Sequence, residues 1–444
     1  MSDAALPASG TTGAKQKSSL HELDARTKAR NAAESRFKMY GIVAIATGVL
    51  FLIILLASII SSGTPAFWRM VVEVELNLSQ EQIDEAEGTL LKTAAYERLF
   101  VTALQESLEA RNLDIEIDAD AIDRIVGNTG GTLRSYYQAN PGDIGQSVSF
   151  ELPTSSRVDG YYKGRVTREN FVDSRFLVVT DLDIVDVMHD AGVIHSSFNW
   201  TFITGSDTGV DNPGGAGIGA SVIGSFFMML VVLVLSLPIG VAASIYLEEF
   251  APKNRFTDLI EVNISNLAAV PSIVFGILGL AVFIQFAHLP QSAPIVGGLV
   301  LTLMTLPTII ISTRASLKAV PPSIRDAALG VGASKMQAVF HHVLPLAMPG
   351  ILTGTIIGLA QALGETAPLL LIGMVGFVAR HPDSLFAGFM EPNSAMPAQI
   401  YNWASRADVS FYEKAWGGII ILLAFLITMN IIAIILRRRF ERRW

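Results

Sequence analysis

The sequence contains no cysteine. Disulfide bonds, thiolate metal sites and nucleophilic cysteine chemistry are therefore excluded. Charge is scarce as well, because only 16% of the 444 residues are charged whereas 51% are apolar. A chain of this length and apolar content is too long for one domain and too apolar for an ordinary soluble protein. A membrane protein is therefore the first hypothesis.

Six long apolar runs carry no Lys, Arg, Asp or Glu, with Glu365 as the single exception. They cover residues 39–61, 218–247, 263–285, 294–313, 350–378 and 416–436. Each is long enough to cross about 30 Å of hydrocarbon at about 1.5 Å per residue. The segment after the first run, Ser62-Gly63-Thr64-Pro65, is not a convincing cleavage site, so that run is interpreted as an uncleaved span. The sequence predicts a mainly α, polytopic membrane protein with six transmembrane helices.

Basic residues indicate the orientation, because loops rich in Lys and Arg stay on the cytoplasmic side. With a cytoplasmic N-terminal tail (residues 1–38), the inside segments hold 18 basic residues, whereas the short outside loops hold only Arg380, Arg406 and Lys414. Both termini are then cytoplasmic and residues 62–217 lie outside. A bacterial inner membrane location with a large external insertion is expected.

The insertion (residues 62–217) carries 25 acidic and 11 basic residues, a formal charge of −14, whereas the rest of the chain sums to +6. Apolar Val72, Val74, Leu76 and Leu78 alternate with polar residues and predict a strand. Ser79 with Gln82 forms a capping-box pattern that opens a helical stretch toward Leu108. Residues 114–118 and 176–179 are typical of further strands, so a small periplasmic α+β domain is expected.

Two acidic clusters in the insertion are candidate calcium ligands, but both lack the glycine and the closing glutamate of a calcium loop, and solvated faces are favoured. They are Asp118, Asp120 and Asp123, and Asp181, Asp183 and Asp186. Because a field of like sign lowers the local concentration of an anion, the insertion is expected to dock or space rather than to collect an oxyanion.

The cytoplasmic loop (residues 319–346) predicts a helix, an elbow and a second helix. Ser323 can cap a helix over 324–331, with Asp326 reaching back to its start, and Gly332 suits a left-handed stop. Ser334 and Gln337 form a second capping box that opens a helix through Leu344, ended by Pro345. Such a pair of short helices is suited to a groove on a partner, although it could also be a connector lying on the membrane.

The loop resembles the segment by which ABC importer permeases couple to their ATPases. The matching positions are Asp326-Ala327-Ala328, Gly332 and Leu344-Pro345. Asp326 stands where the family usually has Glu, and His342 where it usually has Ile. The resemblance implies a type I ABC importer permease fold (residues 218–444 with five transmembrane helices after the first) and partner ATPase subunits. It leaves open whether Asp326 contacts the ATPase or serves the helix start.

The chain has no Gly-x4-Gly-Lys-Ser/Thr loop, so ATP and Mg²⁺ are expected on the partner ATPase, with no cofactor in this chain. No Ser/His/Asp or metal constellation supports an enzyme. Adjacent His341 and His342 point about 100° apart on a helix and are not expected to share a metal ion. The chain is interpreted as a transport subunit and not as an enzyme.

The fifth apolar run places Glu365 about 24 Å along a helix from Pro349, at 1.5 Å per residue. An ionisable residue inside a membrane faces a pathway or a buried partner by default. Gly364 and Pro368 would loosen or kink the helix, which suits a gate and also suits a packing bend. The candidate translocation residues are Gln361, Gly364, Glu365, Thr366, Pro368 and Arg314.

The string Gly364-Glu365-Thr366-Ala367-Pro368-Leu369-Leu370 resembles the A-type permease of the phosphate-specific ABC importer, the PstA family. Residues 238–241, 245–249 and 269–276 are similar to that family as well, and the resemblance covers 218–444 with the first span. It implies import of inorganic phosphate, a companion permease in a heterodimer and a periplasmic phosphate-binding protein. No nucleic-acid partner is expected.

One departure bears on the substrate. Many relatives carry Arg at the positions that Gln361 and Ile311 occupy here, and oxyanions favour guanidinium partners. Arg314 lies one turn nearer the cytoplasm. Glu365 is therefore expected to be protonated or paired with a cation of the companion permease. Other cargoes (molybdate, sulfate or a metal ion) and a membrane-anchored sensor are the alternatives, although a mere anchor needs neither Glu365 nor the coupling loop.

Overall fold

The computed structural model describes residues 25–111, 113, 119–127, 129–170, 177–209, 213–374, 378 and 382–440. The chain divides into two compact units, residues 1–58 and 59–444, and each is described by itself. Most of helix α1 (Ala25–Gly63) belongs to the first unit. Its apolar side chains from Met39 to Leu56 are largely exposed, as lipid-facing side chains are. The predicted first span therefore lies within a longer helix.

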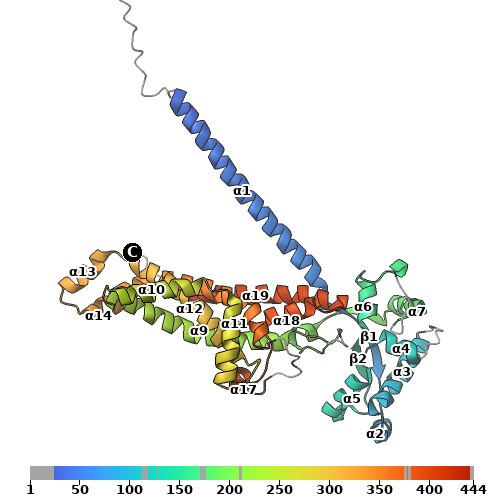
Figure 1. Ribbon diagram of the computed structural model, residues 1–444. Coiled ribbons are helices and arrows are strands. Elements are labelled where there is room, and N and C mark those ends of the chain that lie inside the picture. The colour runs from blue at the N-terminus through green and yellow to red at the C-terminus, as the bar shows by residue number, and fades with distance from the viewer. Residues whose placement is uncertain are drawn as a thin grey trace, which may run out of the picture. The chain divides into compact units, whose positions relative to one another are not determined.

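Five helices of the described chain are long and apolar enough to cross a membrane, and a sharply bent pair raises the number to six if it counts as one span. Besides α1, they include α9 (Gly219–Ile245), α12 (Pro294–Lys318), α15 (Leu344–Gly364) and α19 (Val409–Phe440). Within the second unit, α12 packs against both α9 and α15, and α15 packs against α19 (Figure 1). Their shared apolar core confirms a mainly helical membrane protein.

The span predicted over residues 263–285 is broken by a sharp bend and is not one continuous helix. Two helices stand there, α10 (Arg255–Ala268) and α11 (Ser272–Leu278), and a π-helical segment (Gly279–Phe286) continues α11. The pair is bent by 103°. Pro271 explains the break, because proline has no N–H for a continuing helix and its own backbone is extended (ψ 136°) at the start of α11.

The fifth predicted span, residues 350–378, is also interrupted. Helix α15 ends at Gly364, and a separate short helix, α16 (Ala367–Leu371), follows. Glu365 lies between them with an extended backbone (φ −77°, ψ 128°). The sequence had suggested a carboxylate in the middle of a helix. The structure places it at a helix end instead. Two short helices, α17 (Leu385–Met390) and α18 (Met396–Ala404), lead to α19.

The insertion is built on an antiparallel sheet of three strands in the order β2 (Val148–Pro153), β1 (Trp68–Leu76), β3 (Ile194–Phe198). Strand β1 lies in the centre, and Val72 pairs with Leu152 on one side and Ile194 on the other. The predicted alternation is confirmed, because Val72, Val74 and Leu76 are buried whereas Glu75 is exposed. The α+β character of this region is confirmed with it.

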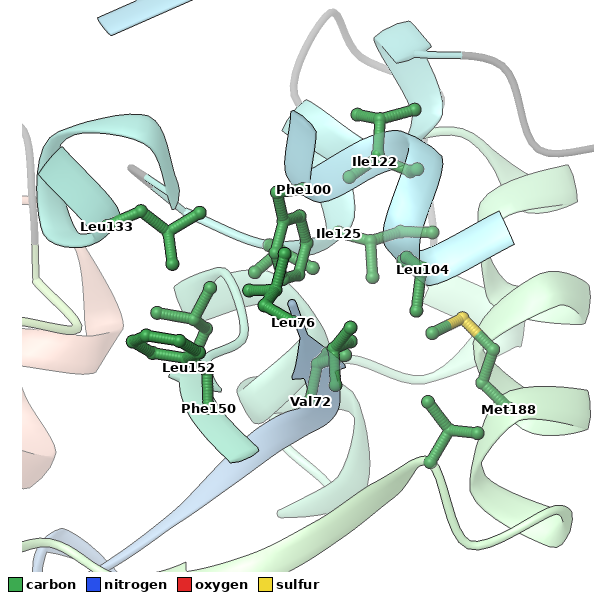
Figure 2. Close-up of a cluster of buried hydrophobic side chains, with 14 of the residues drawn as sticks. Val72, Leu76, Phe100, Leu104, Ile122, Ile125, Leu133, Phe150, Leu152 and Met188 are labelled. Carbon is green, nitrogen blue, oxygen red and sulfur yellow. The ribbon is translucent and has the colours of Figure 1, made fainter. Parts of the chain in front are cut away.

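Helices cover the sheet of the insertion and complete its core. They are α2 (Gln80–Gly88), α3 (Lys92–Ala110), α4 (Ala119–Ile125), α5 (Thr129–Ala139), α6 (Ser156–Tyr162) and α7 (Val179–Asp190), whereas the short helix α8 (Trp200–Thr204) packs through Phe202 in the core of the membrane helices. Figure 2 shows Val72 and Leu76 of β1 facing Phe100 and Leu104 of α3, with Met188 of α7 beside them. Burial of such side chains contributes about 1.5–3 kcal/mol each.

Two local predictions in the insertion need correction. The Ser79–Gln82 capping box is confirmed, but the helix that it opens stops at Gly88, and α3 begins again at Lys92. The predicted strand at residues 176–179 is wrong where the structure describes it, because α7 starts at Val179 and Asp181 accepts the Val178 N–H at its start. The strand predicted at residues 114–118 lies outside the described residues.

Candidate functional site

The loop over residues 319–346 forms the predicted elbow, with helix α13 (Pro322–Gly330) as its first arm. The helix begins at Pro322 with Pro321 as its capping residue, and no side chain caps it. The predicted cap by Ser323 and Asp326 is therefore wrong. Pro322 occupies a first-turn position, where a missing N–H costs nothing and the fixed φ favours the helix. The Asp326 carboxylate is exposed and left out of the helix start.

Arg325 fastens α13 to the ends of two spans. Its guanidinium makes a fork with Glu249 (Nη2 to Oε1 2.6 Å, Nε to Oε1 3.1 Å), which lies in the π-helical segment Tyr246–Phe250 after α9. It also donates to the carbonyls of Leu317 (2.9 Å) and Val320 (2.8 Å) at the end of α12. A cation that satisfies the last carbonyls of a helix stabilises that end. Arg325 therefore links α13 directly to the ends of α9 and α12.

The elbow turns at Gly332, as predicted. Its φ of +88° is a left-handed conformation that favours glycine. The Ser334–Gln337 capping box is also confirmed, at the start of α14 (Lys335–Gln337). The helix is not ended by Pro345, however. It continues through a π-helical segment (Ala338–Val343) into α15, so that Lys335–Gly364 forms one long helix with Pro345 inside it.

The elbow has a buried side and an exposed side. Ala328, Val339 and Val343 are buried, and the last two belong to a small core with Leu317 and Ile351, on which Leu344 packs. Asp326 and Ala327 are exposed on α13. The exposed large apolar side chains of the elbow are Leu329, Val331, Met336 and Phe340. An apolar exposed tip on a firmly attached helix has the chemistry of a docking surface for a groove on another protein.

Arg314 is engaged by carboxylates near the same end of the helices. It donates to Glu261 of α10 (Nη2 to Oε1, 2.7 Å) and contacts Glu248 (3.4 Å), which Lys318 also approaches at 3.5 Å. This cluster joins α10, α12 and the end of α9. Among the described residues Arg314 pairs with Glu248 and Glu261 and not with Glu365, so its predicted place in a translocation pathway stays a prediction.

Small residues bring α15 close to α12. A Cβ atom added at Gly354 would stand 2.1 Å from Ser312 Oγ, and one at Gly350 would stand 2.3 Å from Ser316 Oγ. Glycine is needed here for close approach of two helices, which is how small residues act in membrane interfaces. The opposite situation holds at Gly364, where an added Cβ would meet nothing within 4 Å.

The interruption after α15 gathers the remaining predicted pathway residues. Gln361 and Gly364 are exposed, and Glu365 and Thr366 are partly buried. Pro368 is buried in α16, which packs on α11 so tightly that a Cβ at Gly276 would stand 2.7 Å from Pro368 Cα. No ion pair or hydrogen bond joins the Glu365 carboxylate to another described side chain. Non-helical backbone at membrane depth is typical of a cavity or pathway lining.

The acidic clusters of the insertion are largely paired. Asp181 is 1% exposed and accepts a fork from Arg124 (2.7 and 2.9 Å), so its assignment to a solvated face is wrong. Asp183 and Asp186 both pair with Arg168. Asp120 and Asp123 are exposed, as predicted, and Asp118 lies outside the described residues. Among the residues that the structure describes, no group of three His, Cys, Asp or Glu could hold a metal ion.

One carboxyl of the insertion has a strongly lowered pKa. Side-chain hydrogen bonds from Arg134, and then from Lys92, lower the pKa of Glu87 to about 2. Arg134 binds it as a fork (Nε to Oε1 2.7 Å, Nη2 to Oε2 3.2 Å) and joins α5 to the end of α2. This shift belongs to a structural ion pair and indicates no catalysis.

Sequence reasoning named Arg325 only as a basic residue and gave Glu249 no role. The signal that could have found the pair is their opposite charge at neighbouring helix ends, because a carboxylate just after α9 and an arginine just after α12 meet when these two helices pack.

Residues 236–444 match the family described as binding-protein-dependent transport system inner membrane component. Residues 24–171 match a domain of unknown function, DUF3333, which takes in the first span and much of the insertion.

Two relatives and one solved structure are similar to about half of the chain. A phosphate transport system permease protein PstA of Haemophilus influenzae is 31% identical over 48% of this chain and 72% of its own. A probable ABC transporter permease protein, YqgI of Bacillus subtilis, is 28% identical over 54% of this chain and 83% of its own. A chain of the MetNI methionine ABC transporter in an inward-facing conformation covers 51% of this chain and 95% of its own, with 16% identity and a TM-score of 0.38.

Proposed function

The chain belongs to the family of inner membrane components of binding-protein-dependent transport systems, and from this premise we propose that its cargo is inorganic phosphate. It is a multi-pass permease of an ABC importer and not its ATPase. The observation that supports phosphate as the cargo is the similarity of the membrane half of this chain to permeases named for phosphate transport. Family membership also implies an ATPase and a binding protein as partners.

We further propose that the companion is a second permease in a heterodimer and that the binding protein delivers phosphate from outside. Both termini are then cytoplasmic. The exposed tip of the elbow, with Asp326, Ala327 and Leu329 on α13, docks on the ATPase, and the Arg325–Glu249 fork passes the motion to α9 and α12. The exposed side of α15 at Gln361 and Gly364, with Glu365 and Thr366 beside it, faces the pathway.

The cargo is tested by uptake of labelled phosphate into proteoliposomes that contain this chain with its ATPase, companion permease and binding protein. We expect ATP-dependent uptake that excess unlabelled phosphate abolishes and that sulfate and molybdate leave unchanged. Uptake that sulfate or molybdate suppresses as strongly as phosphate would assign the permease to another oxyanion. Absence of phosphate uptake, with ATPase activity intact, would refute the phosphate proposal.

A further inference from the structure

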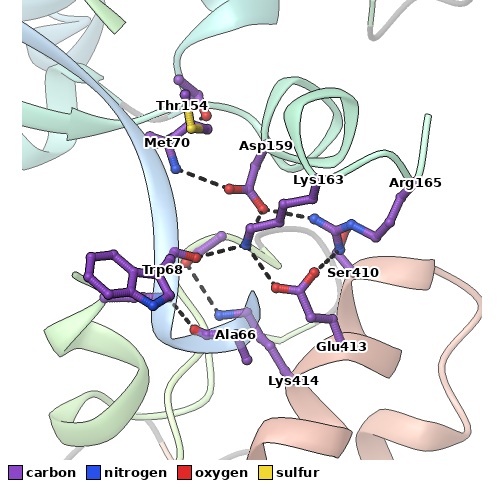
Figure 3. A network of polar contacts seen from close by, with 12 residues as sticks. Ala66, Trp68, Met70, Thr154, Asp159, Lys163, Arg165, Ser410, Glu413 and Lys414 are labelled. Carbon is purple, nitrogen blue, oxygen red and sulfur yellow. Dashed lines mark hydrogen bonds and ion pairs between the residues drawn. The ribbon is translucent and has the colours of Figure 1, made fainter. Parts of the chain in front are cut away.

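An ion-pair ring joins the insertion to the last span. Lys163, just after α6, contacts Asp159 and Glu413 at 2.8 Å each, and Arg165 contacts the same two carboxylates at 2.8 and 2.9 Å. Asp159 and Lys163 come from the insertion and Glu413 from the start of α19, and Figure 3 shows the four side chains facing one another. Two carboxylates and two cations balance, so the ring itself is neutral.

Two further cations lie beside this neutral ring without a carboxylate partner. Lys414 is 6% exposed, and its Nζ donates to the Ala216 carbonyl at 2.6 Å. Arg69 of β1 donates from Nη1 to Thr201 Oγ1 at 3.2 Å, and its Nε is buried without a hydrogen-bond partner among the described residues. No ion pair joins either side chain to a described carboxylate. Burial lowers the pKa of Arg69, which reports the cost of holding its charge there.

All six charged side chains line one cavity of about 30 Å³, which Asn199 and Ser410 also line. Four basic side chains stand against two carboxylates in the lining of the cavity, so the basic groups are in excess by two. Buried charge without a partner is costly, and buried donors without acceptors are costly as well. A guanidinium, an ammonium and free N–H donors around one cavity are the groups that recognise a tetrahedral oxyanion.

We propose that this cavity is an oxyanion site outside the membrane and that its ligand is inorganic phosphate, held by Arg69 and Lys414. The need for an anion follows from the charge of the cavity, whereas the choice of phosphate rests on the proposed function. The empty space holds about two waters, so binding displaces them and turns the flexible ends of both side chains toward the ligand. A ligand bound here contacts both the insertion and α19. The cavity also supplies cations, whereas Ile311 and Gln361 supply none in the membrane part.

The experiment measures binding of labelled inorganic phosphate to the full chain in lipid nanodiscs by equilibrium dialysis. We expect saturable binding to the unaltered chain and a loss of affinity of about tenfold or more for Arg69→Gln and for Lys414→Met, because each removes a charge-assisted contact. Arg69→Lys keeps the charge and should bind better than Arg69→Gln. Arg98→Gln removes an exposed arginine of α3 and is the matched control with unchanged affinity.

The melting temperature of each variant without phosphate checks its folding, and phosphate should raise it for the unaltered chain and for Arg98→Gln but not for Arg69→Gln. If Lys414→Met does not fold, the Arg69→Gln and Arg69→Lys pair decides. No binding by the unaltered chain, or equal binding by Arg69→Gln, overturns the site. If the complete importer still takes up phosphate in that case, the proposed phosphate transport is supported and the proposed site at Arg69 and Lys414 is refuted. Binding of sulfate without phosphate overturns the ligand assignment.

Discussion

The interpretation of Glu365 changes once its backbone conformation is known. Its position in an apolar run suggested a carboxylate in mid-helix, whereas the structure places it where α15 ends and before α16 begins. A carboxylate at an interruption can turn toward a pathway without straining a helix. Its side chain is paired with no described side chain, so the predicted pairing with a cation of another subunit stays a prediction.

The substitution Glu365→Gln tests that role. We expect phosphate uptake by the complete importer to fall about tenfold or more at unchanged expression, because an intramembrane carboxylate is retained for function. Labelled uptake into proteoliposomes measures it. Glu391→Gln, which neutralises an exposed acid before α18, is the matched control and should transport normally. Normal uptake by the Glu365 variant would end any special role for the carboxylate.

Glu87 gives a prediction for pH. Its folded pKa of about 2 lies below the ordinary value of 4.5, so its ion pairs stabilise the insertion above about pH 4.5 and lose that contribution as the pH falls toward 2. We expect Glu87→Gln to lower the melting temperature at pH 6 and to lower it less at pH 3. Thermal unfolding of the full chain in detergent at both pH values measures this.

The control for this pH effect is Glu81→Gln, which neutralises an exposed acid in the first turn of the same helix. Its effect on the melting temperature should be small at both pH values. An equal loss at pH 6 and pH 3 for Glu87→Gln would show that the hydrogen-bonded shape of the side chain matters and its charge does not.

At the scale of elements, one guanidinium supplies the charged contacts that bind α13, the first arm of the elbow, to the ends of α9 and α12. Arg325 reaches Glu249 and the carbonyls of α12 at once, whereas the exposed tip of the elbow is free to dock. Removing the arginine leaves the Glu249 carboxylate, which is 8% exposed, without its partner. The loss of one member of a buried pair costs about 3–5 kcal/mol.

We therefore expect Arg325→Gln to reduce binding-protein-stimulated ATPase activity of the complete importer about tenfold or more, because motion of α13 no longer reaches α9. Arg325→Lys should recover only part of the activity, since a lysine cannot form the fork. Lys253→Gln removes another exposed cytoplasmic cation and should have no effect. Stimulated ATPase activity in the Arg325→Gln importer equal to that of the unaltered one would contradict the transmission.

The sequence predicts those elements well that are formed by interactions between residues close together along the chain. Both capping boxes, at Ser79 and Ser334, are contacts between residues three apart, and both are confirmed. The bend at Pro271 has a local signal in the proline itself, whereas the end of α15 and the continuation through Pro345 depend on packing between distant helices, about which periodicity carries no information. The Arg69–Lys414 cavity was missed for the same reason, because its residues are 345 positions apart in the chain.

At the scale of the whole molecule, the insertion leaves and returns to the membrane part at one place, because Trp68 of β1 pairs with Phe198 of β3. Paired residues of antiparallel strands have Cα atoms about 4.5–5.5 Å apart, so a two-residue turn can close the gap. Deleting residues 70–196 between the paired Arg69 and Ser197 should therefore leave the membrane helices folded. The deletion also removes Asp159, Lys163 and Arg165, which exposes Glu413 to water.

We expect the double substitution Lys163→Gln with Arg165→Gln to lower the melting temperature more than this deletion does. The substitution removes both cations that pair with the buried Asp159 and Glu413, whereas the deletion leaves no buried charge of the ring. Thermal unfolding in detergent compares the two. Recovery of the double variant by Asp159→Asn with Glu413→Gln is the control, and a deletion that is less stable than the double variant would contradict the argument.

The central position of β1 in the sheet affects how the insertion folds during synthesis. Strand β1 leaves the ribosome first, and its partner β3 follows more than 100 residues later. At roughly 5–20 residues per second, β1 waits about 10 s with an unpaired edge. Unpaired strand edges invite aggregation. The growing chain therefore passes through a vulnerable interval before β3 is made, in which a chaperone that shields an apolar strand would raise the yield of finished permease.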